Sequence, residues 1–140
     1  MRKLRLSFLI IFFITIGSCS KIESDPNPDT QDDQNLTDYN GTGYVSELNN
    51  IGAMVMFAID VETSKSYDMD VRYKTNSEFK DATVTLYVND VMIQNLTLPM
   101  SKNFRTINVT VPLTSGSNYI VLKTDTSDNG EYCLDYIELK

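Results

Sequence analysis

The sequence predicts an all-β protein, a β-sandwich of about eight short antiparallel strands. Apolar and polar residues alternate along several stretches with the period of two that marks a half-buried strand. Turn residues separate these stretches at intervals of roughly ten residues, which is typical of sandwiches and barrels. Between residues 39 and 140 no stretch has helical periodicity, so helices are not expected there.

The first strands follow a glycine-rich loop. Gly41 and Gly43 allow backbone angles that a side chain would forbid, so the loop can bend tightly before a short strand that opens at Tyr44. An Asn-Asn-Ile-Gly turn at 49–52 then leads into an unbroken apolar run. Segment 66–74 alternates cleanly between apolar and charged residues. Its charged face, expected to be in solvent, carries Asp68, Asp70, Arg72 and Lys74.

The remaining strands are separated by turns. Strands are expected at 82–88 and 91–98, joined by a turn at Asn89-Asp90, and then at 106–113, 118–124 and 133–139. About 100 residues are enough to build one core. The alternating apolar residues expected in that core are Met54, Met56, Val84, Leu86, Val109, Val111, Ile120 and Leu122.

The N-terminus has the layout of a secretory signal. Three basic residues precede an apolar run over 6–16, which is shorter than the roughly 20 residues of a membrane-spanning helix. The run ends in Ile-Gly-Ser-Cys, which resembles the lipobox of bacterial lipoproteins. We therefore expect a signal at 1–19, lipidation at Cys19, and an exported protein anchored by lipid in the bacterial envelope, at the outer membrane or cell surface. The alternative is an ordinary signal peptide with an incidental cysteine.

Composition excludes several functions. Without the three basic residues of the signal, nine basic residues stand against nineteen acidic ones, a net charge of −10, which argues against binding nucleic acid or anionic lipid. With Cys19 lipidated, Cys133 has no partner for a disulfide. The sequence contains no histidine, so nucleophilic catalysis by a Ser–His or Cys–His pair is excluded, and we expect the protein not to be an enzyme.

Residues 20–38 are polar and acidic, with two prolines and few apolar side chains. Such a segment cannot bury enough apolar surface to offset its ordering entropy, so we expect a flexible tether. The expected organisation is thus a signal at 1–19, a tether at 20–38 and one β-sandwich domain at 39–140.

Five stretches of the domain, in order, resemble carbohydrate-binding modules of families 6 and 35. They are YNGTGYVSELNNIGAMVMFAIDV, SYDMDVRY, ATVTLYVND, VPLTSGSNYIVLKT and LDYIEL, and they cover nearly all of residues 39–140. The resemblance implies a β-jelly roll whose loops at one end hold a sugar. It also implies a function, the non-catalytic binding of a polysaccharide or oligosaccharide.

The resemblance places Tyr44 at the sugar site. An aromatic face there can pack on the C–H groups of a sugar ring while polar groups bind its hydroxyls; the alternative is an ordinary tyrosine at the edge of the core. Phe104 lies within a residue of the place where family members carry tryptophan, and it offers a smaller face. Cys133 replaces an asparagine that binds a sugar hydroxyl, a loss for which Tyr132 or Asn129 would compensate.

The resemblance also implies a structural calcium ion, but most of its ligands are absent. Family members carry two glutamates on a first strand, whose place the acidic tether takes here. Of the family's ligands only Asp135 carries over, and one carboxylate is a poor site for an ion that takes about 6–8 oxygens. The alternative for Asp135 is to accept hydrogen bonds from backbone amides. The missing strand leaves a sheet edge that either the tether or another protein chain would cover.

Two other groups of carboxylates have simpler explanations. The loop at 125–131 groups Asp125, Asp128, Asn129 and Glu131, whose oxygens could bind calcium, but we favour a hairpin turn with Asn129-Gly130 at its tip. Asp68 and Asp70 belong to a solvated strand face, whereas the carboxylates of a glycosidase flank a cleft.

Two functions therefore remain. The first is a lipid-anchored, non-catalytic module that holds a polysaccharide at the cell surface through Tyr44, Phe104, Asn129 and Tyr132. The second is a jelly roll that has lost its sugar and acts as a structural or protein-interaction module of a surface complex, with the open sheet edge as its binding surface.

Overall fold

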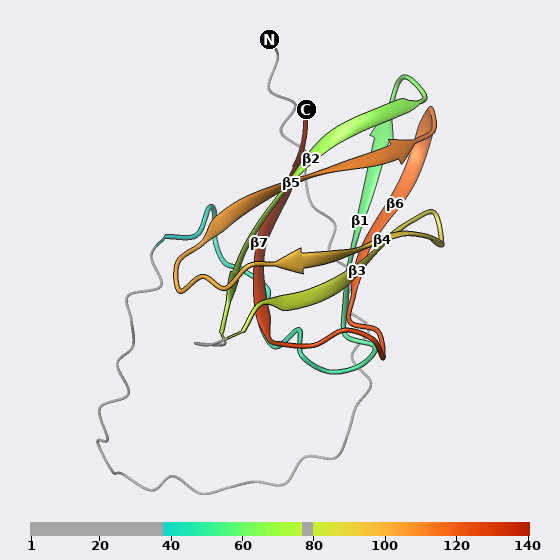
Figure 1. The fold of residues 1–140 in the computed structure, drawn as a ribbon. Coiled ribbons are helices and arrows are strands. Elements are labelled where there is room, and N and C mark those ends of the chain that lie inside the picture. The colour runs from blue at the N-terminus through green and yellow to red at the C-terminus, as the bar shows by residue number, and fades with distance from the viewer. Residues whose placement is uncertain (1–37, 77–79) are drawn as a thin grey trace, which may run out of the picture.

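The structure is a computed structural model that describes residues 38–76 and 80–140. Two antiparallel sheets make up this part of the chain, with the strand orders β1-β6-β3-β4 and β5-β2-β7 (Figure 1). The strands are β1 (Met54–Val61), β2 (Lys65–Thr75), β3 (Ala82–Val88), β4 (Val91–Leu98), β5 (Arg105–Leu113), β6 (Gly116–Lys123) and β7 (Tyr132–Leu139). The predicted all-β sandwich is confirmed.

Some predictions concern residues that the structure does not describe. The signal at 1–19, its lipidated Cys19 and the tether up to residue 37 lie outside the described residues, so these remain predictions. In the described ranges no helix is long and apolar enough to cross a membrane.

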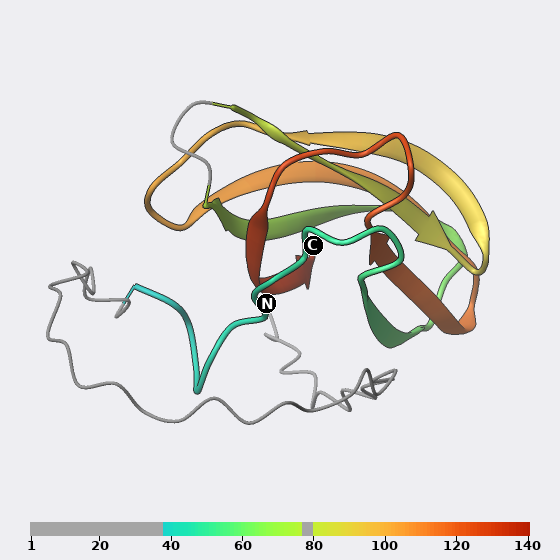
Figure 2. The same cartoon turned by 90° about the horizontal axis from the view of Figure 1, so that it is seen from below.

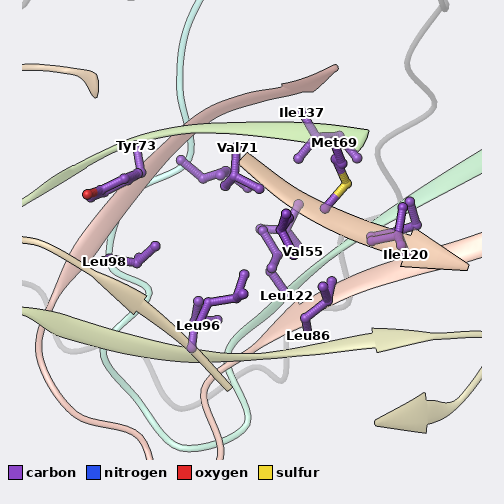
Figure 3. Packing of buried hydrophobic residues seen from close by; sticks show 14 of the residues in the cluster. Val55, Met69, Val71, Tyr73, Leu86, Leu96, Leu98, Ile120, Leu122 and Ile137 are labelled. Carbon is purple, nitrogen blue, oxygen red and sulfur yellow. The ribbon is translucent and has the colours of Figure 1, made fainter. Parts of the chain in front are cut away.

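The core lies between the two sheets. Alternate residues of β2, among them Met69, Val71 and Tyr73, point from the three-stranded sheet toward Leu86 and Leu122 of the four-stranded sheet (Figure 3). These five side chains are fully buried. Burying each of them stabilises the folded state by on the order of 2 kcal/mol, so the apolar residues that alternate in the sequence are also the main source of stability.

The face of β1 that turns toward the core differs from the prediction. Met54 and Met56 were expected in the core, but they are 52% and 47% exposed, and Val55 and Ile59 are buried instead. Val55 lies opposite the core residue Leu122 of β6, and this pairing sets the face that turns inward. The apolar run on β1 gives no alternation from which that face could be chosen.

The turn between β3 and β4 was predicted correctly. Asn89 and Asp90 have φ angles of 49° and 65°, the left-handed conformation that both central residues of a type I′ hairpin turn adopt. Their short polar side chains tolerate this conformation better than most residues do. The two-residue turn fixes the register in which Val88 faces Val91, and an irregularity between Leu86 and Tyr87 then shifts it by one residue, so that Ala82 faces Leu98.

The connection over 125–131 is not the predicted hairpin. It joins β6 in the four-stranded sheet to β7 in the three-stranded sheet, so it crosses from one layer to the other. Asp128 holds it in place, because its carboxylate accepts hydrogen bonds from Thr85 Oγ1 at 2.8 Å, from the Asp125 amide at 2.9 Å and from Asn95 Nδ2. The predicted turn residue Gly130 has a φ of 86° and lies against Ala82 of β3.

Residues 38–46, which we call the arm, lie along the outer edge of β7. Val45 and Leu134 exchange two backbone hydrogen bonds of 2.8 Å, the antiparallel bridge that joins the arm to the sheet. Figure 2 shows the arm, in blue-green, beside β7, in dark red. The short strand expected at Tyr44 is therefore a single bridge, and the chain's own arm covers part of the outer edge of β7.

Gly130→Ala should destabilise the domain by about 2 kcal/mol or more. A Cβ at this position would lie 2.8 Å from the Cα of Ala82, and the backbone angle disfavours any side chain. Gly43→Ala is the matched control, since its Cβ would meet nothing within 4 Å. Urea unfolding should place the control within about 0.5 kcal/mol of the wild type. Equal losses for the two variants would contradict the described crossing.

Asp128 should make stability depend on pH. Burial alone would raise the pKa of Asp128, but the hydrogen bonds to its carboxylate outweigh burial and hold the pKa below its usual value. The stabilisation is thus fully present above the unfolded pKa of about 4 and is lost as pH falls through the lower folded pKa. We expect Asp128→Ala to cost about 1–2 kcal/mol at pH 7, allowing for solvent screening.

The same substitution should cost less at pH 3, where urea unfolding would show a smaller gap between variant and wild type. Thr126→Ala, at an exposed position in the same loop, removes no ionisable group, so this control should show no such pH dependence. A gap that widens on acidification would contradict the role given to Asp128.

Candidate functional site

Three aromatic rings gather where the arm meets the three-stranded sheet. The Tyr44 ring lies between two others, with centroid separations of 5.5 Å to Tyr39 and 5.5 Å to Phe104. Tyr39 and Tyr44 belong to the arm, and Phe104 directly precedes β5. The rings meet at tilted and edge-on angles, which aromatic pairs prefer to face-to-face stacking. Tyr44 is half-buried, so part of its ring faces solvent.

Two cations of β2 lie over these rings. Lys74 Nζ lies 5.9 Å from the centroid of Tyr44 and 5.8 Å from that of Phe104, and Arg72 Cζ lies 5.7 Å from Phe104. Arg72 and Lys74 share a face because side chains two apart on a strand point the same way. This end of the face was expected in solvent, but both residues are only partly exposed. The site therefore combines an aromatic surface with positive charge.

A polar group lies beside Lys74. Lys74 pairs in register with Cys133 of β7, and the Cys133 thiol lies 3.4 Å from Asn76 Oδ1. Asn76 Nδ2 donates to Glu131 Oε1 at 2.9 Å, so the amide of Asn76 is held in a fixed orientation. Burial raises the pKa of the Cys133 thiol, which keeps it protonated and a poor ligand for a hydroxyl. Asn76 is exposed and offers the amide that position 133 lacks.

Asp135 ties the arm to β7. Its side chain is 0% exposed, and its carboxylate accepts hydrogen bonds from Arg72 Nε at 3.0 Å and from the Asn40 amide at 3.0 and 3.1 Å. The alternative in which Asp135 accepts a hydrogen bond from a backbone amide is thus confirmed. Arg72 Nη2 in turn donates to the Asp38 carbonyl at 2.8 Å. One ion pair joins β2, β7 and the start of the arm.

The surroundings of Asp135 do not fit a calcium ion. N–H donors, one of them cationic, face its oxygens, whereas calcium requires several oxygen ligands. Within residues 38–76 and 80–140 no group of three or more His, Cys, Asp or Glu side chains could hold a metal. In the 125–131 loop, Asp125 pairs with Lys123 at 2.7 Å and accepts a hydrogen bond from Tyr87. Its carboxylate is therefore also engaged by protein groups.

The structure brings together two of the four predicted sugar-binding residues, Tyr44 and Phe104, whose ring centroids lie 5.5 Å apart, and places the other two elsewhere. Phe104 is 8% exposed, so it packs against Tyr44 and offers little of its own ring to a sugar. Tyr132 is 1% exposed and belongs to the core, and burial raises its pKa. Asn129 bonds through its backbone to Thr83 of the four-stranded sheet, opposite the sheet that carries the cluster.

Sequence reasoning missed Tyr39, Lys74 and Asn76. Tyr39 had a signal, since it mirrors Tyr44 across the glycine-rich loop. Lys74 and Asn76 had none, because their place beside Cys133 depends on how β2 pairs with β7. That pairing includes a register shift between Arg72 and Tyr73, which alternation alone does not reveal.

Known proteins resemble this chain in sequence. A model of the family described as carbohydrate binding module (family 35) matches residues 27–140. The 1,6-alpha-glucosyltransferase of Sporosarcina globispora is 34% identical over 108 residues, 74% of this chain and 8% of that protein. The cycloisomaltooligosaccharide glucanotransferase of Niallia circulans is 27% identical over 127 residues, 88% of this chain and 13% of that protein. The chain thus matches only a small part of these curated relatives.

Solved structures share the fold. A family 35 carbohydrate binding module from an environmental isolate superposes with a TM-score of 0.67 and 30% identity, over 74% of this chain and 77% of that one. The cycloalternan-forming enzyme of Listeria monocytogenes, solved with a pentasaccharide substrate, superposes with a TM-score of 0.69. It is 32% identical, over 74% of this chain and 10% of that one. The two-sheet sandwich is therefore a jelly roll, and the chain belongs to family 35 of the carbohydrate-binding modules.

Proposed function

We propose that this chain is a lipid-anchored, non-catalytic module that holds an α-glucan at the bacterial cell surface. The observation that carries the proposal is the half-buried Tyr44 ring, held at 5.5 Å by Tyr39 and by Phe104. A ring held on two sides can pack on the C–H face of a sugar with little further loss of side-chain entropy. Lys74 Nζ lies 5.9 Å from the centroid of the Tyr44 ring, and Asn76 is an exposed residue two positions further along the chain. Both side chains carry N–H donors for sugar hydroxyls.

The class of sugar comes from the relatives. Three curated proteins that match this chain are named as a 1,6-alpha-glucosyltransferase, an isomaltosyltransferase and a cycloisomaltooligosaccharide glucanotransferase. Each is a larger protein in which this module is a small part. Their names make α-1,6-linked glucose the first ligand to test.

The membrane anchor rests on the sequence around Cys19. The basic, apolar and small residues before that cysteine match the order in a lipoprotein signal. When the protein is expressed in bacteria supplied with labelled palmitate, we expect the wild type to become labelled. The Cys19→Ala variant should not become labelled. Labelling that persists in the variant, or is absent from the wild type, would contradict the anchor and leave the sugar site unaffected.

A second function is favoured by the outer face of the four-stranded sheet. Met56, Val121, Tyr87 and Met92 lie in register across all four strands, and Tyr119 nearby is 51% exposed. An exposed apolar surface on a small domain is a feature of protein-interaction sites. A module of this kind would bind a partner protein and ignore sugars.

Tyr44→Ala should weaken binding of an isomaltooligosaccharide at least about tenfold, because the stacking surface is removed. Tyr44→Phe keeps the ring and should stay within about threefold of the wild type. Calorimetry on residues 20–140 would measure both affinities, and circular dichroism would verify the fold of each variant.

Tyr119→Ala and Tyr132→Phe are the matched controls, one on the opposite face and one in the core. Both should bind like the wild type. A wild-type domain that is folded but binds no glycan of a broad panel, or that loses binding in Tyr119→Ala alone, would reject the proposed site and leave the interaction module.

A further inference from the structure

We propose that Arg72 does in this domain what a bound cation would otherwise do: it neutralises the buried Asp135 and fixes the arm that carries Tyr44. The chain thereby builds its candidate site without a metal ion. The part that concerns sugar affinity rests on the function proposed above. The part that concerns the arm and the stability of the domain stands on geometry alone.

The carboxylate of Asp135 needs a compensating charge within the protein. Its side chain is fully buried, and a buried carboxylate is stable only when it is paired and hydrogen-bonded. Arg72 Nε at 3.0 Å supplies the positive charge, and the Asn40 amide supplies a shared hydrogen bond to both oxygens. A calcium ion on the same oxygens would have to displace these donors and would be repelled by the guanidinium.

Arg72 also contacts the start of the arm and the aromatic cluster. Its Nη2 donates to the Asp38 carbonyl at 2.8 Å and lies 3.5 Å from the Asp38 carboxylate. Its Cζ lies 5.7 Å from the centroid of Phe104, the ring that supports Tyr44. One side chain therefore contacts the first residue of the arm, the carboxylate of β7 and the base of the aromatic cluster.

The shape of the guanidinium suits these contacts. Three contacts are made at once: Nε donates to Asp135, Nη2 donates to the Asp38 carbonyl, and Cζ lies over the ring of Phe104. A planar fork of donors makes such contacts together in a fixed geometry, whereas a lysine ammonium is a compact charge on a flexible stem and does not reproduce all of them. The arm is thus held at both ends, by Arg72 near Asp38 and by the bridge at Val45.

The test compares Arg72→Met, Arg72→Lys and Arg105→Met, the last an exposed arginine of β5 as matched control. Removing one partner of a buried pair should lower the Tm of Arg72→Met by about 8 °C or more. The Tm of Arg72→Lys should lie between those of Arg72→Met and the wild type. The Tm of Arg105→Met should differ from the wild type by less than about 4 °C. Limited proteolysis should cut the arm of Arg72→Met faster than that of the control. Equal Tm values and equal cleavage for Arg72→Met and Arg105→Met would overturn the proposal.

A second substitution keeps the proposal testable if Arg72→Met folds poorly. Asp135→Asn removes the buried charge while leaving an oxygen for the Asn40 amide, so adding it to Arg72→Met should restore part of the lost Tm. The cycle of the two single variants and the double variant should therefore be strongly non-additive. Losses that simply add would show that the two side chains act independently, against the proposal.

Calcium supplies the opposing outcome. The Tm of the wild-type domain should be the same in calcium chloride and in EDTA. A site that binds calcium at a hundredfold excess over its Kd would raise the Tm by about 10 °C or more, and such a rise would overturn the proposal. None of these readouts requires a glycan, so they separate a failure of the Arg72 proposal from a failure of the proposed function. If an isomaltooligosaccharide binds, Arg72→Met should also lose at least about fivefold in affinity through displacement of Tyr44.

Discussion

The buried carboxylate of Asp135 is the constraint on which the candidate site depends. A charge with no exposure to solvent must be compensated within the protein, and the compensating groups here are Arg72 and the Asn40 amide. Each of them comes from a different part of the chain, so satisfying one charge brings together β2, β7 and the arm. The aromatic cluster then forms on this framework, because Arg72 lies against Phe104 and Phe104 supports Tyr44. Stability and the shape of the site are in this way linked through one ion pair.

Most of the fold could be predicted because its signals are local. Alternation and turn residues located the strands from 66 onwards, and the tight turn at Asn89-Asp90 set one register. Two features needed information from distant residues. The inward face of β1 depends on its pairing with β6, since the run around Met56 is apolar on both faces. The connection at 125–131 looked like a hairpin, and only the sheet partners of β6 and β7 make it a crossing between layers.

The site was less predictable than the fold, for the same reason. Tyr44 could be located because a glycine-rich loop and an aromatic residue form a local pattern. The depth of Phe104 and Tyr132 could not, because a side chain's burial depends on what packs over it. The neighbours of Cys133 follow from the irregular register between β2 and β7, so the position of Lys74 in the site could not be predicted from the sequence. Both sheets have partly apolar outer surfaces, and the three-stranded sheet adds two cations and a fixed amide next to the aromatic cluster.

The most direct test of a sugar site at this cluster is an NMR titration of the ¹⁵N-labelled domain with an isomaltooligosaccharide. The amide shifts should move in the arm around Tyr44, at Lys74 and Asn76, and next to Phe104, while those around Tyr119 stay in place. Shifts confined to the outer face of the four-stranded sheet, or no shift up to the solubility limit of the sugar, would contradict the account.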